Sequence, residues 1–229
     1  MARLTDGRTA IECDHLPDVL VLTFSSPILS LDVLDQFSSI LQNLTEKSAH
    51  GPLVLCSGHP SVFLAGAHLA EIATLDASSS APYARRGREA IRRLENHPAP
   101  TVAAINGSCS GGGFDLILAC DALIAGPDAR FSHPGIRRGL VTGWSGTTRL
   151  PSALGGAMAR TALLETRELE PDPLSHLGSV HRTVEGHREI AIEKARQLAS
   201  LDPARYQLWR ALRGFDFVDR FHASVVHKL

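Results

Sequence analysis

A glycine-rich segment in the middle of the chain holds the residues best suited to chemistry. Residues 107–115 read GSCSGGGFD, after an apolar run typical of a strand and before an apolar run with helical spacing. Consecutive glycines at the start of a helix leave the backbone N–H groups uncovered by side chains. These N–H groups have no acceptor inside the helix, and they lie at the positive end of the helix dipole. Such donors bind an anion, or an oxygen that becomes negative during a reaction. Close packing of a helix on a strand would explain the same glycines without a ligand.

A second group of small residues lies earlier in the chain. Residues 62–69 read VFLAGAHL, so that AGA interrupts an apolar run where a new helix is expected to begin. This turn is a candidate for a further set of exposed N–H donors. Taken alone, it is explained more simply as a strand-to-helix turn.

Because both motifs occur in this order, the sequence resembles the enoyl-CoA hydratase/isomerase (crotonase) family, as a divergent member. The resemblance covers residues 19–201, and its strongest stretches are FLAGAHLAEI, PTVAAINGSCSGGGFDL, CDALIAG, FSHPGIRRGL and GTTRLPSALG. It implies a ClpP/crotonase fold, an α/β spiral of repeated ββα units, usually a homotrimer or a dimer of trimers. It also implies an acyl-coenzyme A thioester ligand, with coenzyme A as part of the substrate and no separate cofactor.

The same resemblance implies roles for individual residues. Its oxyanion hole consists of the backbone N–H groups of Ala67 and Gly112, with Gly111 beside them. Two fixed donors of this kind stabilise a thioester enolate more than they stabilise the ground state. The family's contacts with the adenine part of coenzyme A fall on the backbone of the AGA segment, here Ala65, Gly66, Ala67, His68 and Leu69.

The sequence departs from the family at both acid–base positions. The family's hydratases use two glutamates, and those positions hold Asp115 and Gly135 here. Aspartate retains carboxylate chemistry with a shorter reach, whereas glycine has no side chain. Three possibilities stay open: an atypical lyase or isomerase of fatty-acyl metabolism, another crotonase reaction such as thioester hydrolysis, decarboxylation or dehalogenation, and a catalytically weak acyl-CoA-binding subunit.

Three side chains remain as candidate proton carriers, Asp115, His133 and His68. His133 lies two residues before the missing carboxylate, and an imidazole acts as acid or base near neutral pH. Each of the three also has a structural explanation. Asp115 would interact with the helix dipole as an acid in the first turn. His133 would be a hydrogen-bonded loop residue, and His68 would line the coenzyme A channel. Trp144 stands where the family has small residues, so it either narrows the acyl pocket or packs in the core.

A cysteine nucleophile is a more remote hypothesis. Residues 107–111 read G-x-C-x-G between a strand and a helix, which resembles the nucleophile elbow of α/β-hydrolases with Cys109 as the nucleophile. This hypothesis leaves the AGA motif without an explanation.

The composition is that of an ordinary globular protein: 229 residues, 44% hydrophobic and 21% charged, with a formal net charge of -1. Scattered Lys and Arg residues argue against a nucleic-acid partner, and no apolar run is long enough to span a membrane. The four cysteines lack CxxC spacing and no secretory start is visible, which favours free thiols in the cytoplasm. The eleven histidines do not form a metal-ligand set.

Alternating strand and helix patterns predict an α/β protein with mostly parallel strands. Strands are expected at residues 19–24, 53–56, 101–105, 122–125, 129–132 and 180–184. Helices are expected at residues 31–44, 85–95, 114–120, 146–154, 157–164, 187–201 and 204–213, with a mobile loop at residues 78–82. We expect a core domain of residues 1–201 and a short helical C-terminal extension of residues 202–229.

Overall fold

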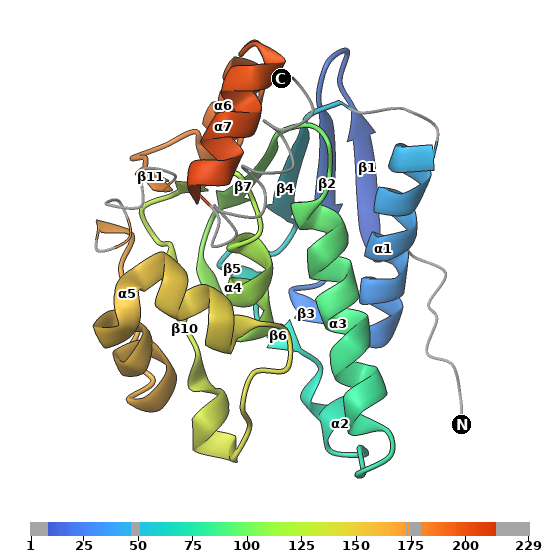
Figure 1. The fold of residues 1–229 in the computed structure, drawn as a ribbon, viewed down its shortest axis with the longest axis vertical. Helices are drawn as coiled ribbons and strands as arrows, with labels where there is room; N and C mark the ends of the chain where they lie inside the picture. Colours follow the sequence, from blue (N-terminus) through green and yellow to red (C-terminus); the bar gives the residue numbers. More distant parts are fainter. Residues whose placement is uncertain (1–8, 47–50, 173, 175–179, 214–229) are drawn as a thin grey trace, which may run out of the picture.

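The structure, a computed structural model, describes residues 9–46, 51–172, 174 and 180–213, apart from the side chains of residues 209 and 211–213. Figure 1 shows its elements in chain order. The strands are β1 (Ile11–His15), β2 (Leu20–Phe24), β3 (Ile28–Leu29), β4 (Leu53–Ser57), β5 (Val62–Leu64), β6 (Gly66–Ala67), β7 (Thr101–Ile105), β8 (Ser108–Ser110), β9 (Ala122–Ala125), β10 (Arg130–Ser132) and β11 (Val180–Arg182). The helices are α1 (Leu31–Glu46), α2 (Leu69–Ile72), α3 (Ser80–Glu95), α4 (Gly112–Ile117), the 3-10 helix η1 (Pro134–Arg138), α5 (Gly146–Leu164), α6 (His187–Ala199) and α7 (Pro203–Arg213).

A strand, a shorter strand and a helix recur along the chain and form a spiral. The first strands of these units, β2, β4, β7 and β9, pair in parallel within a six-stranded sheet of order β1-β2-β4-β7-β9-β11. The short strands β5, β8 and β10 form a second, parallel sheet, while β3 pairs with β6. β1 alone pairs antiparallel in the main sheet. The predicted α/β spiral of ββα units is therefore confirmed.

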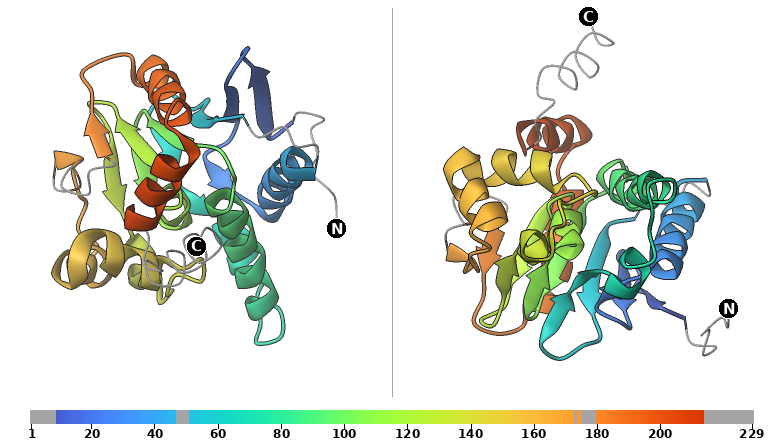
Figure 2. Two further views of the ribbon diagram at one scale, coloured as in Figure 1. Left: turned by 45° about the horizontal axis from the view of Figure 1, so that its top comes forward. Right: turned by 90° about the horizontal axis from the view of Figure 1, so that it is seen from below.

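Alternating side chains along the main strands divide the core between the two faces of the sheet. In β4, Leu53 and Leu55 join the larger core, beneath α1 and α3, which lie side by side (Figure 1). Val54 and Cys56 point to the opposite face, where α6 covers them with Ala191 and other small apolar residues (Figure 2). Strands buried on both faces carry continuous apolar runs, which is why these strands are visible in the sequence.

One of the expected elements is wrong, and others are confirmed with shifted bounds or a local break. The mobile loop expected at residues 78–82 is instead a turn at residues 78–79 followed by the start of α3 at Ser80. The Asp76 carboxylate orders this turn by accepting hydrogen bonds from the N–H and hydroxyl groups of Ser78 and Ser79. The helices expected at residues 146–154 and 157–164 are confirmed as the two halves of α5, which are separated at Gly155, whose φ of 75° and ψ of 154° lie outside the helical region. The helix expected at residues 114–120 is α4, which begins two residues earlier and ends sooner.

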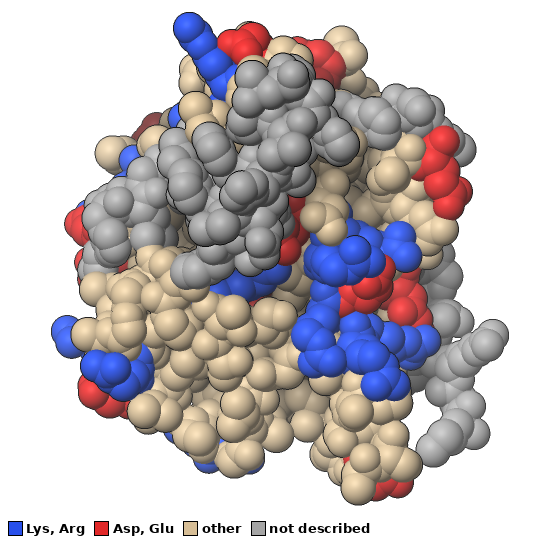
Figure 3. All heavy atoms as spheres, in the orientation of Figure 1, with Lys and Arg blue, Asp and Glu red and all other residues tan. Residues whose placement is uncertain are grey.

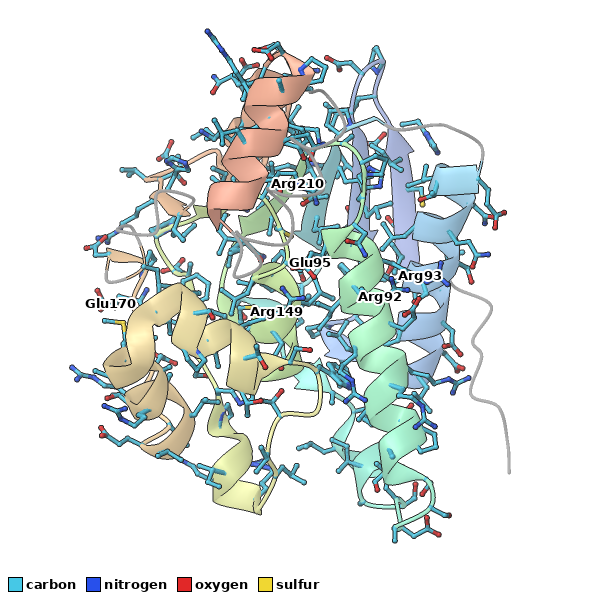
Figure 4. All side chains as sticks on the ribbon, in the orientation of Figure 1. Arg92, Arg93, Glu95, Arg149, Glu170 and Arg210 are labelled. Carbon is cyan, nitrogen blue, oxygen red and sulfur yellow. The ribbon has the colours of Figure 1, made fainter. Side chains whose placement is uncertain are left out.

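The helix α7 is held to the core by buried polar groups. The Tyr206 hydroxyl donates to Oδ2 of Asp121 over 3.0 Å, and Nε of Arg210 lies 3.3 Å from Oδ1 of the same carboxylate. Arg210 also donates to the carbonyl oxygens of His97 and Glu95, and its position above Glu95 is visible in Figure 4. Residues 214–229, most of the extension expected from the sequence, lie outside the described residues. No described helix is both long and apolar enough to cross a bilayer.

Candidate active site

The two small-residue turns singled out in the sequence lie against each other. Gly66 has a φ of 90°, and a Cβ added there would be 2.8 Å from both the Gly112 nitrogen and the Ser110 oxygen. Such a distance is shorter than real Cβ contacts, so only glycine lets the turns approach this closely. As a result, Ala67 and Gly112 face the same cavity.

Hydrogen bonds fix the second turn against its neighbours. The Ser110 hydroxyl donates to the Ala65 carbonyl over 3.0 Å, which ties the two turns together directly. The N–H of Gly111 donates to the Ser132 carbonyl over 3.0 Å, so this donor serves the fold. Gly112 follows as the first residue of α4, where backbone N–H groups have no partner inside the helix.

A cavity of about 630 Å³ opens beside these turns. Of the residues expected to bind substrate, Ala65, Ala67, Leu69, Gly111, Gly112 and Trp144 line it, and so do Asp115 and His133. Gly66 and His68 are not part of the lining. His68 instead points its Nδ1 atom toward Glu71, 3.6 Å away. Apolar side chains from α2 and from residues 140–141 complete the walls, which suits an acyl chain.

Asp115 and His133 form a buried pair at the end of this cavity. Asp115 is 0% exposed and His133 4%, and Nε2 of His133 lies 3.3 Å from Oδ1 of Asp115. The other carboxylate oxygen, Oδ2, accepts a hydrogen bond of 2.5 Å from the Thr142 hydroxyl. The structure thus brings the two candidate proton carriers together, and it places Gly135 on the wall of the same cavity.

The indole ring of Trp144 packs against the backbone of Gly112, whose N–H is one of the two candidate donors. A Cβ at either Gly112 or Gly87 would overlap the indole ring, so both positions need glycine to make room for it. The indole stacks on Tyr83 with ring centroids 6.0 Å apart, and burial raises the pKa of the Tyr83 hydroxyl to about 12. Arg88 holds the Trp144 loop to α3 by donating to the Gly143 carbonyl over 2.7 Å.

A second cavity, of about 1010 Å³, lies on the outer side of Tyr83 between α1, α3 and the start of α5. Arginines of α3 line it, and Figure 3 shows Lys and Arg gathered over this helix. Many of these arginines are ion-paired within the same groove, as Arg86 with Asp35 over 3.0 Å and Arg149 with Glu95 over 2.7 Å (Figure 4). Six arginines line this groove against three acidic residues, Asp35, Glu89 and Glu95, so the ion pairs offset only part of the arginine charge.

Cys109 does not occupy a nucleophile elbow. It lies in the middle of β8, fully buried, and burial raises its pKa well above the usual range, with the nearby Asp115 carboxylate acting in the same direction. A thiol held in its protonated form is a poor nucleophile. Within the described residues, no cluster of three or more His, Cys, Asp or Glu side chains is arranged to hold a metal ion.

Sequence reasoning missed several residues that shape this site. Thr142, Gly146 and Tyr83 contact Asp115 or Trp144, yet none belongs to the two glycine motifs. Thr142 lies 27 residues beyond Asp115, and nothing in its local sequence indicates that contact. Gly87, inside a helix where glycine is unfavourable, is the one position whose residue type hinted at a close approach.

Comparison with known proteins gives consistent matches across most of the chain. A model of the enoyl-CoA hydratase/isomerase family matches residues 17–212. A probable enoyl-CoA hydratase of Bacillus subtilis (strain 168) is 34% identical over 186 residues, which are 80% of this chain and 71% of that protein. The solved structure of Pseudomonas aeruginosa DspI superposes with a TM-score of 0.82 at 26% identity, over 98% of this chain and 100% of the other.

The mammalian relatives are longer than this chain. Mitochondrial methylglutaconyl-CoA hydratase of Rattus norvegicus is 32% identical over 173 residues, which are 75% of this chain. The matched part is 55% of the rat protein, so the chain spans about half the length of this relative.

Proposed function

This chain belongs to the enoyl-CoA hydratase/isomerase (crotonase) family, and we propose that it binds an acyl-coenzyme A thioester and stabilises negative charge on the thioester oxygen. The donors are the backbone N–H groups of Ala67 and Gly112. The observation that carries this proposal is the contact between the two turns, which leaves Ala67 and Gly112 facing one cavity.

Two backbone donors suit enolate chemistry because they act most strongly on a developing charge. When a proton leaves the carbon next to the thioester, its electron pair moves onto the carbonyl oxygen. Donors already fixed at that oxygen stabilise the enolate more than the neutral thioester, and a single donor of this kind is worth about 3 kcal/mol of barrier. The rigid packing of Gly66 on Gly112 supports such preorganisation.

Asp115 and His133 are the proposed proton carriers. Their contact of 3.3 Å and their burial support proton transfer between them and a substrate held at the Gly112 donor. Gly135 supplies no second carboxylate, so the two-glutamate route for adding water does not fit this site. A reaction that takes a proton from the α-carbon and returns it to that carbon or to the γ-carbon needs no activated water, which favours an atypical isomerase. An atypical lyase is the other reaction within this proposal.

Gly135 also favours a second candidate, an acyl-CoA-binding subunit with little turnover of its own. The donors of the oxyanion hole would then hold a thioester without transforming it. Thioester hydrolysis, decarboxylation and dehalogenation use the same two donors and remain among the proposed reactions.

The remaining parts of the proposal follow from family membership. The adenine part of coenzyme A runs along the backbone of residues 65–69, with no cofactor beyond the coenzyme of the substrate. We propose that the protein acts in the cytoplasm on fatty-acyl substrates and assembles as a homotrimer or a dimer of trimers.

Turnover of a panel of acyl- and enoyl-CoA esters tests the proposal, with Asp115→Asn as the comparison. We expect measurable turnover in the native protein, and a loss of roughly 100-fold or more in Asp115→Asn with the dissociation constant little changed. Equal turnover in both proteins would exclude Asp115 as a proton carrier. Tight binding with no turnover of any ester would instead support the binding-subunit alternative, and absence of binding would overturn the proposal altogether.

A further inference from the structure

We infer that Thr142 is a positioning residue that fixes the Asp115 carboxylate for proton transfer with His133. This inference rests on the proposed role of Asp115. It adds a residue that stands outside both glycine motifs and that acts through Asp115 rather than on the substrate itself.

The hydrogen-bond directions around Thr142 are determined by its neighbours. The backbone N–H of Trp144 points at the Thr142 hydroxyl oxygen over 3.3 Å, and an N–H can only donate. The hydroxyl oxygen therefore accepts from Trp144, and its single proton is left to donate to Oδ2 of Asp115 over 2.5 Å.

This arrangement leaves one oxygen of Asp115 for chemistry. Oδ2 is held by Thr142, whereas Oδ1 faces Nε2 of His133 at 3.3 Å. Because the carboxylate is planar, fixing Oδ2 also fixes the direction of Oδ1. The imidazole nitrogen and the carboxylate oxygen are thereby held 3.3 Å apart, although the two atoms make no hydrogen bond in this arrangement.

Glycine at position 146 makes the space that the fixed carboxylate needs. A Cβ added to Gly146 would overlap Oδ1 of Asp115 and would be 2.6 Å from the Thr142 methyl carbon. Asp115 is thus confined between the Thr142 side chain and the backbone at the start of α5.

Loss of the hydroxyl should uncouple the carboxylate, and it also removes the acceptor of the Trp144 N–H. Valine has the shape of threonine but cannot donate, so Oδ2 would be buried without its partner. The carboxylate would then turn to find another donor, and Oδ1 would leave its place beside His133. A displacement of about 1 Å at a reacting group costs roughly 100-fold in rate.

Three variants test this inference: Thr142→Val, Thr142→Ser and a control, Thr148→Val. Thr148 is an exposed threonine in the first turn of α5. With an acyl-CoA ester that the native protein turns over, we expect kcat to fall roughly 100-fold in Thr142→Val while the dissociation constant changes less than about threefold. Thr142→Ser should recover most of the lost rate, and Thr148→Val should match the native protein. In an Asp115→Asn background, Thr142→Val should cause little further loss. Native kcat in Thr142→Val, or an equal further loss when Thr142→Val is added to Asp115→Asn, would overturn the inference.

A crystal structure of Thr142→Val provides a readout that needs no turnover. We expect the Asp115 carboxylate to have rotated away from His133 while the backbone of residues 110–115 stays in place. An unmoved carboxylate would overturn the role of Thr142 even in an active enzyme. A rotated carboxylate in a protein that turns over no ester would support the positioning role and count against the proposed function alone.

Discussion

The backbone nitrogen of Gly112 lies so close to Gly66 that a Cβ at Gly66 would be only 2.8 Å away from it. This contact joins two turns that are far apart in the sequence, and it sets the separation of the proposed donors at Ala67 and Gly112. A methyl group at Gly66 must therefore either push the turns apart or strain a backbone whose φ of 90° already disfavours a side chain.

Gly66→Ala is expected to lower turnover of acyl-CoA esters by about 100-fold, because one donor moves away from the thioester oxygen. Gly51→Ala is the matched control, since a Cβ there meets no atom within 4 Å. Steady-state kinetics on both variants, with thermal unfolding to verify folding, makes the measurement. Native rates in a folded Gly66→Ala protein would show that the contact between the turns is irrelevant to function.

Trp144→Leu is expected to widen the acyl end of the cavity. The indole lies against Gly112 and stacks on Tyr83, which also lines the cavity, so a smaller side chain frees space next to the proposed thioester position. Titration calorimetry with butyryl- and decanoyl-CoA should show the preference for the longer chain rising by about tenfold or more. Phe37→Leu, a core substitution away from the cavity, should lower stability without changing this preference.

The Cys109 thiol is expected not to react with alkylating reagents in the folded protein. Its burial and its raised pKa leave almost no thiolate, so a thiol-alkylating reagent at about pH 8 should leave it unmodified until the protein unfolds. Cys13 is exposed and should react in the native protein, whereas burial raises the pKa of Cys56 to about 11. Mass spectrometry of the labelled peptides gives the result. Rapid alkylation of Cys109 accompanied by inactivation would revive the cysteine-nucleophile hypothesis.

Arg210→Met is expected to destabilise the protein without altering its chemistry. Arg210 faces the fully buried Asp121 carboxylate, and removal of one partner of such a pair costs about 3–5 kcal/mol in the free energy of unfolding. Urea unfolding measures this loss, while kcat at 25 °C should stay near the native value. A large fall in kcat in the folded variant would mean that α7 contributes to the activity as well as to the stability of the fold.

The parallel strands of the main sheet and the glycine turns were predictable from the sequence because their signals are local, whereas the largely exposed edge strand β1 was not expected. Buried strands such as β4 and β7 are continuous apolar runs, and the glycines at 111–113 interrupt the pattern where a helix begins. Local signals failed at residues 78–82, where small residues indicated a loop but the Asp76 side chain organises a helix start.

The environment of Asp115 was not predictable in the same way. Its contacts with His133, Thr142 and Gly146 depend on how successive ββα units stack, and no short spacing in the sequence records that stacking. The sequence supplied Asp115 and His133 as separate candidates, and only the fold brings them together. The resemblance to a family supplied the proposed roles of Ala67 and Gly112.

Infrared difference spectroscopy of a bound thioester with a 13C-labelled carbonyl tests the central claim most directly. Hydrogen bonds from Ala67 and Gly112 to the carbonyl oxygen weaken the C=O bond. The labelled band should therefore shift to lower frequency in the native complex than in water, and the shift should shrink in Gly66→Ala. A tightly bound thioester whose carbonyl absorbs at its frequency in water would contradict the oxyanion hole.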